Sequence, residues 1–103
     1  MKLYIAGPMT GIDEMNAPAF NAAADALRAM GYEVVNPADN GFGEGTWIDY
    51  MRRDITDLLT CDAIALLPGW ERSKGATLEY DIFTRLELPA HSLEFWLETA
   101  SRI

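Results

Sequence analysis

Short apolar runs alternate with longer segments of helical spacing over the first ninety or so residues, and this alternation constrains the fold more than any other feature. The runs are 3–6, 33–35 and 62–67, and each is followed at once by a Gly-Pro, Asn-Pro or Pro-Gly pair. Runs so short and so apolar are typical of strands that are covered on both faces. Between and after them, the spacing of apolar residues predicts helices over 17–30, 46–60 and 75–87. This alternation indicates an α/β fold with a parallel sheet and helices on both faces.

The segment after Pro89 carries a weaker pattern. Ser92 is suited to cap a helix, and the residues that then follow with helical spacing are Leu93, Trp96, Leu97 and Ala100. We therefore expect a terminal helix that packs its apolar side on the body of the protein or on a partner subunit.

The length of 103 residues provides for one domain, residues 1–103, with a modest hydrophobic core. Half of the residues are apolar, which is ordinary for a globular protein and argues against disorder or a disulfide scaffold. Because a small core gives a monomer little stability, we expect a homodimer or a larger homo-oligomer.

The charge balance argues against a nucleic acid polymer as a partner. Sixteen acidic residues against eight basic ones give a net charge of −8, whereas affinity for phosphate backbones depends on clustered Lys and Arg. No apolar run is long enough for a membrane span or for the core of a signal peptide, so we expect no membrane partner. The one cysteine, Cys61, lies beside an apolar stretch and is interpreted as a buried side chain in a reducing compartment. We expect a cytoplasmic protein.

Three loops are expected to meet at one edge of the sheet, because ligands of parallel sheets bind outside the carboxyl ends of the strands. Glycines there let the backbone approach a ligand, and amides at a helix start favour an anion such as phosphate. Trp70 has two interpretations, a wall on which an aromatic base stacks or a cover over the core. The candidate substrate-binding residues in these loops are Gly7, Pro8, Met9, Asn36, Gly69, Trp70, Ser73 and Gly75.

Glu79 falls inside the apolar arc of the third predicted helix. Projection at about 100 degrees per residue puts it among the apolar residues of that arc, which are Ala76, Leu78, Ile82, Phe83 and Leu86. A carboxylate is rarely buried unless it is paired or hydrogen-bonded. Either Glu79 reaches into a cavity, or it is a structural acid stabilised by the helix dipole and a nearby hydroxyl.

Asp54 repeats this anomaly on the second helix. It lies at the edge of an apolar stripe whose members are Trp47, Met51, Ile55 and Leu58. A purely structural interpretation is that Asp54 is an acid paired with a basic neighbour. Two acids on the buried sides of two helices nevertheless favour a shared polar cavity. Tyr4, in the first strand, would either add a hydroxyl to that cavity or be part of the core. The spacing of His, Cys, Asp and Glu shows no metal site, and the single histidine, His91, is interpreted as a surface residue.

Several motifs together resemble those of the nucleoside 2-deoxyribosyltransferase-like family, and in particular its short phage and bacterial members. The resemblance extends from about Lys2 to Pro89. It rests on the order and spacing of Leu3-Tyr4-Ile5-Ala6-Gly7-Pro8, Arg53-Asp54-Ile55, Asp62, and Ser73-Lys74-Gly75-Ala76 leading to Glu79.

The resemblance implies a Rossmann-like or flavodoxin-like sheet of about four strands and a hydrolase or 2-deoxyribosyltransferase that breaks an N-glycosidic bond without a cofactor. By position, Glu79 matches the family's nucleophile, Tyr4 the tyrosine that orients it, and Asp54 the acid that handles the departing base. The implied partner is a small nucleoside or deoxynucleotide. Water or a second base would then resolve the glycosyl-enzyme, in the manner of retaining glycosidases.

The chain departs from the family at its carboxyl end, where the asparagine that transferases lend to a neighbouring active site has no recognisable counterpart. A related branch hydrolyses deoxynucleoside monophosphates and binds their phosphate with serines, which Ser73 would match, with Arg72 and Lys74 beside it. The alternative function is a module that binds or sequesters a nucleotide without turnover. A purely structural protein is disfavoured, because a scaffold needs no carboxylate on a buried helix face.

Overall fold

The computed structural model describes residues 1–41 and 45–101 of the chain. Within these residues, four parallel strands form one sheet with the order β2-β1-β3-β4. The strands are β1 (Lys2–Ala6), β2 (Glu33–Val35), β3 (Ala63–Leu66) and β4 (Ala90–Ser92). Because β1 pairs with both β2 and β3, the chain reverses its winding direction there, as in flavodoxin-like sheets. The predicted α/β fold with a parallel sheet is confirmed.

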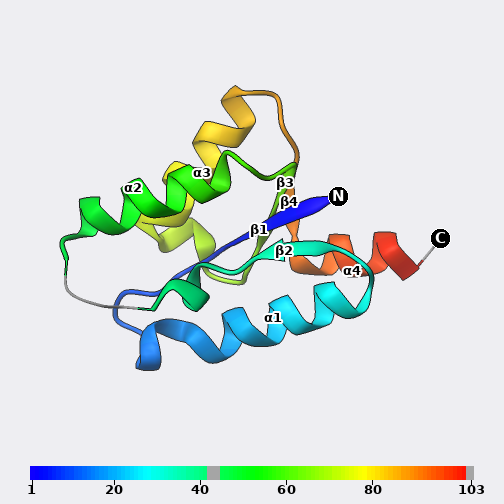
Figure 1. Cartoon of the computed structure of the whole chain (residues 1–103), viewed down its shortest axis with the longest axis horizontal. Helices are drawn as coiled ribbons and strands as arrows, with labels where there is room; N and C mark the ends of the chain where they lie inside the picture. Colours follow the sequence, from blue (N-terminus) through cyan, green and yellow to red (C-terminus); the bar gives the residue numbers. More distant parts are fainter. Residues whose placement is uncertain (42–44, 102–103) are drawn as a thin grey trace.

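Helices cover both faces of this sheet (Figure 1). The helices α1 and α4 lie on one face, and α2 and α3 lie on the other. Their bounds are α1 (Ala17–Ala29), α2 (Trp47–Leu58), α3 (Lys74–Arg85) and α4 (Leu93–Ser101), with short 3-10 turns η1 (Asp13–Asn16), η2 (Pro37–Asn40) and η3 (Trp70–Arg72). The predicted loop over 38–45 thus begins inside η2, and residues 42–44 lie outside the described part of the chain.

Polar side chains set the starts of these helices. Thr46 and Asp49 form a capping box at the start of α2, in which each side chain bonds the backbone amide of the other residue. The Ser73 hydroxyl accepts a hydrogen bond of 3.1 Å from the amide of Ala76 at the start of α3. The hydroxyl of Ser92 accepts from Phe95 in the same way, so the predicted cap of the terminal helix is confirmed.

The strand β1 divides its side chains between two cores because successive residues of a strand point to opposite faces. Leu3 and Ile5 pack with α1 and α4 in a cluster that also holds Phe20 and Leu27. On the opposite face, Tyr4 packs with α2 and α3 in a second cluster. The buried Cys61 belongs to this second cluster, as predicted for a small buried side chain.

The apolar arc predicted for α3 is wrong at two positions. Leu78 and Leu86 are 37% and 54% exposed, although the pattern puts both beside Glu79. The helix turns a narrower stripe to the sheet, whose members Ala76, Glu79 and Phe83 recur at spacings of three and four residues. Leu78 and Leu86 lie on the flanks of that stripe, where the sheet does not reach.

The terminal helix α4 packs on the body of the protein. Trp96 is 4% exposed, and its indole Nε1 donates a hydrogen bond of 2.8 Å to the carbonyl oxygen of Ile64 in β3. Tyr32 donates from its hydroxyl to the carbonyl oxygen of Trp96. Within residues 1–41 and 45–101, none of the helices combines the length and the apolar character that a bilayer span needs.

Candidate active site

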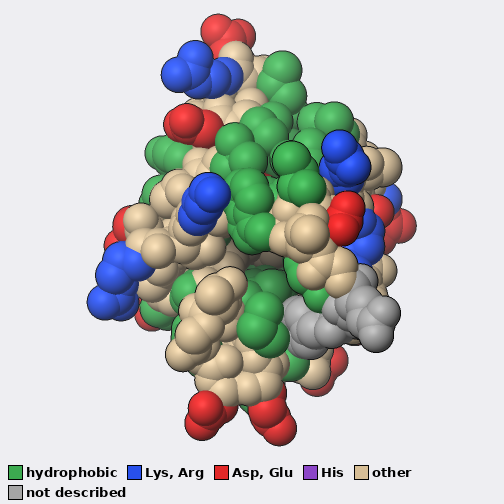
Figure 2. Space-filling model, turned by 90° about the vertical axis from the view of Figure 1, so that its left-hand side faces the viewer, with side chains coloured by type: hydrophobic (Ala, Val, Ile, Leu, Met, Phe, Trp, Pro, Cys, Tyr) green, Lys and Arg blue, Asp and Glu red, His purple; other side chains and the backbone are tan. Residues whose placement is uncertain are grey.

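A pocket of about 430 Å³ opens at the carboxyl ends of β1 and β3, where the chain reverses its winding direction. This is the place at which open parallel sheets bind their ligands. Figure 2 shows the face onto which it opens, hollowed near its centre beneath a group of hydrophobic side chains. The pocket is lined by Tyr4, Ile5, Gly7, Pro8, Met9, Thr10, Met15, Phe20, Pro37, Trp47, Tyr50, Met51, Arg53, Asp54, Arg72, Ser73, Lys74, Gly75, Ala76 and Glu79.

The loop after β1 forms one rim of the pocket and is held in place by close packing. A Cβ atom on Gly7 would lie 2.8 Å from the Cβ atom of Leu67, so no larger residue fits there without a shift of the backbone. The Asn16 side chain donates a hydrogen bond of 2.9 Å to the carbonyl oxygen of Pro8. Gly75 lies on the opposite rim, where a Cβ atom would lie 3.2 Å from the sulfur of Met51, so this flexible side chain would have to shift slightly.

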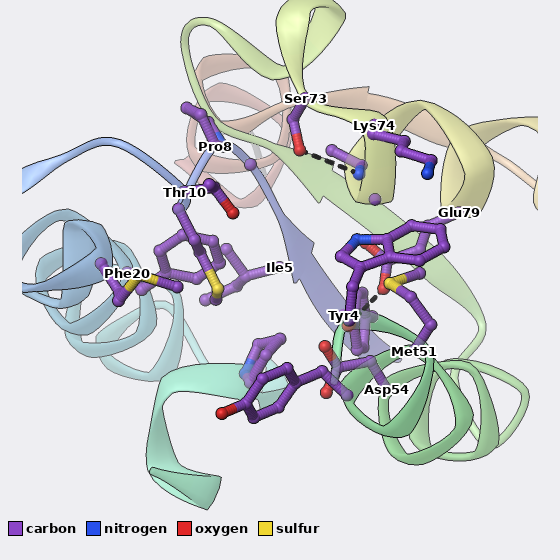
Figure 3. A pocket seen from close by; sticks show the side chains of 18 of the residues that line it. Tyr4, Ile5, Pro8, Thr10, Phe20, Met51, Asp54, Ser73, Lys74 and Glu79 are labelled. Carbon is purple, nitrogen blue, oxygen red and sulfur yellow. Dashed lines mark hydrogen bonds between the residues drawn. The ribbon is translucent and has the colours of Figure 1, made fainter. Parts of the chain in front are cut away.

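Glu79 and Tyr4 meet at the bottom of the pocket (Figure 3). The Tyr4 hydroxyl donates a hydrogen bond of 2.5 Å to Oε2 of Glu79. Glu79 is 5% exposed and Tyr4 is 1% exposed, and both residues line the pocket. This contact agrees with the interpretation in which Tyr4 adds a hydroxyl to the cavity and with the orienting position that the resemblance implies for it.

Asp54 reaches the same pocket from α2 and is 8% exposed. In Figure 3 it lies on the same side of the cavity as Tyr4 and Glu79, whereas Phe20, Ile5 and Thr10 lie on the opposite side. The guanidinium of the preceding residue, Arg53, contacts it, with 3.3 Å between Nε and Oδ1 of Asp54. Both interpretations of Asp54 thus hold, since it faces the cavity and is paired with a basic neighbour.

Burial dominates the electrostatics of this group. Loss of solvation raises the pKa of Glu79 to about 8, against the opposing effect of the hydrogen bond from Tyr4, and the negative charge of Asp54 raises it further. Burial also raises the pKa of Asp54, while Arg53 acts to lower it. The pKa of Tyr4 lies well above its ordinary value because of burial and of the two neighbouring carboxylates.

Cationic side chains line the outer part of the pocket. Arg72, Lys74 and Arg53 are three of the eight basic residues of a chain whose net charge is −8. The Lys74 ammonium lies 4.1 Å from the centre of the Trp47 ring, so the starts of α2 and α3 touch across the pocket mouth. A surface that is mostly acidic therefore presents positive charge at this opening.

The family model described as "Domain of unknown function (DUF4406)" matches residues 1–91. The chain belongs to the DUF4406 family. No curated protein matches the sequence.

The fold of this DUF4406 chain is similar to that of a solved 2-deoxyribosyltransferase from the psychrotolerant bacterium Bacillus psychrosaccharolyticus. The two structures agree with a TM-score of 0.67 over 87% of this chain and 69% of that chain, at 18% sequence identity. That protein is described as a biocatalyst for the synthesis of nucleosides. The resemblance that the motifs predicted is thereby confirmed for the fold.

Of the predicted substrate-binding residues of the DUF4406 chain, five line the pocket, namely Gly7, Pro8, Met9, Ser73 and Gly75. Asn36 does not line it. Its side chain instead donates to Asn21 and accepts from the amide of Ala38, so it serves as the cap of η2 and is buried. The next residue, Pro37, does line the pocket, so the position just after a strand does not by itself identify which residue reaches the site.

Gly69 and Trp70 also lie outside the pocket lining. Gly69 has a φ of 87° and turns the chain after β3, and together with Pro8 it lines a second groove. Trp70 packs against the second core cluster, with its ring centre 4.6 Å from that of Tyr80. The structure thus favours the interpretation of Trp70 as a cover over the core, because its ring is already stacked within the protein.

Other lining residues of the DUF4406 site had no distinct sequence signal. Phe20 and Met51 follow the apolar spacing of α1 and α2, so their pattern is that of ordinary core residues. Trp47 was predicted in the buried stripe of α2 but is 39% exposed, since it lies in the first turn of the helix at the pocket mouth. Arg53 belongs to the motif Arg53-Asp54-Ile55, yet only the structure shows that its side chain contacts Asp54.

Among residues 1–41 and 45–101, no three His, Cys, Asp or Glu side chains gather in a way that could hold a metal ion. His91 lies on β4 and is exposed, as predicted, but its ring does have neighbours, since its centre lies 4.0 Å from that of Phe95.

Proposed function

We propose that this DUF4406 chain cleaves the N-glycosidic bond of a 2′-deoxynucleoside or its monophosphate, with Glu79 as the nucleophile. The observation that carries the proposal is a buried carboxylate that lines a pocket at the carboxyl ends of the strands and accepts a hydrogen bond from Tyr4. The fold that it shares with a 2-deoxyribosyltransferase adds support.

In the proposed reaction, an oxygen of Glu79 forms a bond to the anomeric carbon of the sugar while the bond from that carbon to the base nitrogen breaks. Asp54, on the neighbouring helix, passes a proton to the nitrogen of the departing base. Water or a second base then attacks the anomeric carbon and releases Glu79. The hydrogen bond from Tyr4 fixes the orientation of the carboxylate for attack.

The lining of the pocket suits a flat base joined to a polar sugar. The apolar side chains of Ile5 and Phe20 lie on one side of the pocket together with Thr10. The two acids and Tyr4 lie on the other side, together with Met51 (Figure 3). Pockets for small ligands commonly combine such an apolar wall with a few fixed polar groups. The cavity of about 430 Å³ lies within the range of about 300–1,000 Å³ that is usual for such ligands.

The cations at the pocket mouth support a phosphorylated substrate over a plain nucleoside. Arg72 and Lys74 flank Ser73, which caps the start of α3, and all three residues line the pocket. A phosphate there would meet two positive charges and the amides of a helix start. We accordingly include deoxynucleoside monophosphates among the candidate substrates.

The second candidate function is a module that binds a nucleotide without turnover. One observation favours it: burial raises the pKa of Glu79 to about 8, so this group is mostly neutral at neutral pH and is suited to hydrogen-bond a ligand. The same pocket would then hold the ligand without forming a covalent bond.

Release of free base separates the two functions. The protein is incubated with a panel of deoxynucleosides and their monophosphates, and free base is followed by chromatography. We expect release from at least one of them, and a loss of at least about a thousand-fold in Glu79→Ala and Glu79→Gln. Mass spectrometry of the quenched wild-type protein should detect a deoxyribosyl group on Glu79.

Asp81→Asn is the matched control, because Asp81 is an exposed acid on the same helix. It should release base at the wild-type rate. Binding of a panel compound without release of base, or full release by Glu79→Ala, would remove the case for covalent catalysis; binding alone would leave the second candidate.

A further inference from the structure

The two buried acids of the pocket differ in their partners. Arg53 on α2 contacts Asp54, with 3.3 Å between Nε and Oδ1, and the two side chains are 34% and 12% exposed. The hydrogen-bond partner of Glu79 is the Tyr4 hydroxyl, which is uncharged. Among the described residues, Asp54 is therefore the one of these two acids that forms an ion pair.

A buried carboxylate is stable as an anion chiefly where a counter-charge lies beside it. Two carboxylates in one small cavity also repel each other, so the first ionisation opposes the second. A cavity that holds one bound guanidinium thus favours one anion and one proton on the acid pair. The position of Arg53 decides which acid carries the charge.

The other charged groups around the pair do not reverse this preference. The negative charge of Asp57, also on α2, acts on both Asp54 and Tyr4, but the Asp57 carboxylate accepts a hydrogen bond from Asn40 and is partly exposed. Lys74 and Arg72 line the pocket from its outer part, where Lys74 lies over the Trp47 ring. Neither forms an ion pair with Glu79.

Arg53 is itself fixed by two further contacts. Its guanidinium lies 5.4 Å from the centre of the Tyr50 ring, and its Nη1 donates to the carbonyl oxygen of Gly41 at 3.5 Å. These contacts fix the orientation of the guanidinium plane beside Asp54. Such fixing is expected where the orientation of the guanidinium group matters as well as its charge.

We infer that Arg53 is a positioning residue that holds Asp54 as the anion of the acid pair and leaves the pair's single proton on Glu79 until a substrate binds. This inference deepens the proposed function and rests on it for its catalytic meaning. The arrangement of charge in the free protein follows from the contacts alone.

One proton then serves the whole first step. The proton leaves Glu79, whose oxygen forms the bond to the anomeric carbon, and it reaches the nitrogen of the departing base through Asp54 as the glycosidic bond breaks. Before the step the pocket holds neutral Glu79 and anionic Asp54, and after it a neutral glycosyl ester, anionic Asp54 and a neutral base. The pocket carries one negative charge throughout, which suits a cavity with one bound guanidinium.

The test is a titration of the free protein, followed by the carboxyl 13C shifts of Asp54 and Glu79 in NMR spectra. In the wild type we expect Asp54 to ionise at lower pH than Glu79. In Arg53→Gln, which keeps a hydrogen-bond donor but removes the charge, the Asp54 midpoint should rise by at least about one pH unit. Arg53→Lys should bring it back toward the wild-type value.

Arg52→Gln is the matched control, because Arg52 is the adjacent arginine, is 76% exposed and pairs with Asp49 instead. Its titration should equal that of the wild type. An Asp54 midpoint that is unchanged in Arg53→Gln, or a Glu79 that ionises before Asp54 in the wild type, overturns the inference. Since no substrate is present, the titration is independent of base release: absence of release refutes the proposed function, and an unchanged midpoint refutes the role of Arg53.

Discussion

The two faces of the sheet share the same strands but bury different chemistry. On the face covered by α1 and α4, the buried cluster is apolar throughout and consists of Leu3, Ile5, Phe20, Ala23, Ala24, Leu27, Val34, Ala63, Ala65, Leu67 and Trp96. On the face covered by α2 and α3, the cluster includes Tyr4, and the buried acids Asp54 and Glu79 lie on the same two helices.

This difference shows how a small chain can combine stability with a polar site. Alternate residues of β1 serve the two faces, Leu3 and Ile5 the apolar one and Tyr4 the other. Burying a carboxylate costs free energy unless it is paired. The apolar face offsets that cost, so the polar face is free to hold groups whose arrangement suits chemistry better than packing.

The largest effect that we predict is on the change in stability between about pH 4.5 and pH 8. An unfolded Glu79 ionises near pH 4.5, whereas the folded one ionises at about 8. Its contribution to stability is therefore fully present below pH 4.5 and is lost as pH rises through 8. Glu79→Gln cannot ionise, so relative to the wild type it should gain roughly 3–5 kcal/mol between about pH 4.5 and pH 9. Urea unfolding at both pH values measures this difference.

The apolar face provides the contrasting variant. Leu27 is fully buried there, and Leu27→Ala should lose roughly 2–4 kcal/mol by the same measurement. Because no titrating group is involved, its difference from the wild type should be the same at both pH values. The difference in free energy of unfolding between Glu79→Gln and the wild type could also be the same at both pH values. That result would show that Glu79 ionises as readily as an exposed acid.

Much of this organisation follows from the sequence because its signals are local. Strands end at Gly-Pro, Asn-Pro and Pro-Gly pairs, and helical spacing gives α1, α2 and α3 to within a few residues. Glu79 stands out because a charge on an apolar helix face conflicts with its surroundings. A residue that breaks a pattern is visible in sequence, whereas a residue that obeys one, such as Phe20 or Met51, is not.

The rest depends on tertiary contacts. Asn36 follows a strand but turns its amide to Asn21, and Trp70 stacks on Tyr80. Neither contact can be predicted from the local sequence, since each joins residues of different elements. The short strand β4 has exposed residues and weak β character, and its pairing with β3 defines it. The expected homo-oligomer stays a prediction, which light scattering at micromolar concentration would test.

A smaller effect concerns the pH dependence of base release. If the acid pair must hold one proton, then kcat/KM, which reports on the free protein, should fall about tenfold per pH unit above the Glu79 pKa of about 8. A Glu79 that acts without a shared proton would instead give a rate that rises through this range and then levels off. Rates measured between about pH 6 and pH 10, with a base that does not titrate there, distinguish the two.

The smallest effect, and the sharpest test of the contact that joins β1 to α3, is the removal of one oxygen atom in Tyr4→Phe. The Tyr4 hydroxyl stabilises the charged form of Glu79 and so acts to lower its pKa against burial. Without it, burial raises the pKa further, and the alkaline fall in kcat/KM should move to higher pH by up to about one unit. Tyr80→Phe is the control, because the partly buried Tyr80 ring stacks on Trp70 and packs against the second core cluster. The alkaline fall in kcat/KM could instead stay at the same pH in Tyr4→Phe, or shift equally in both variants. Either result would mean that the Tyr4 contact does not set the ionisation of Glu79.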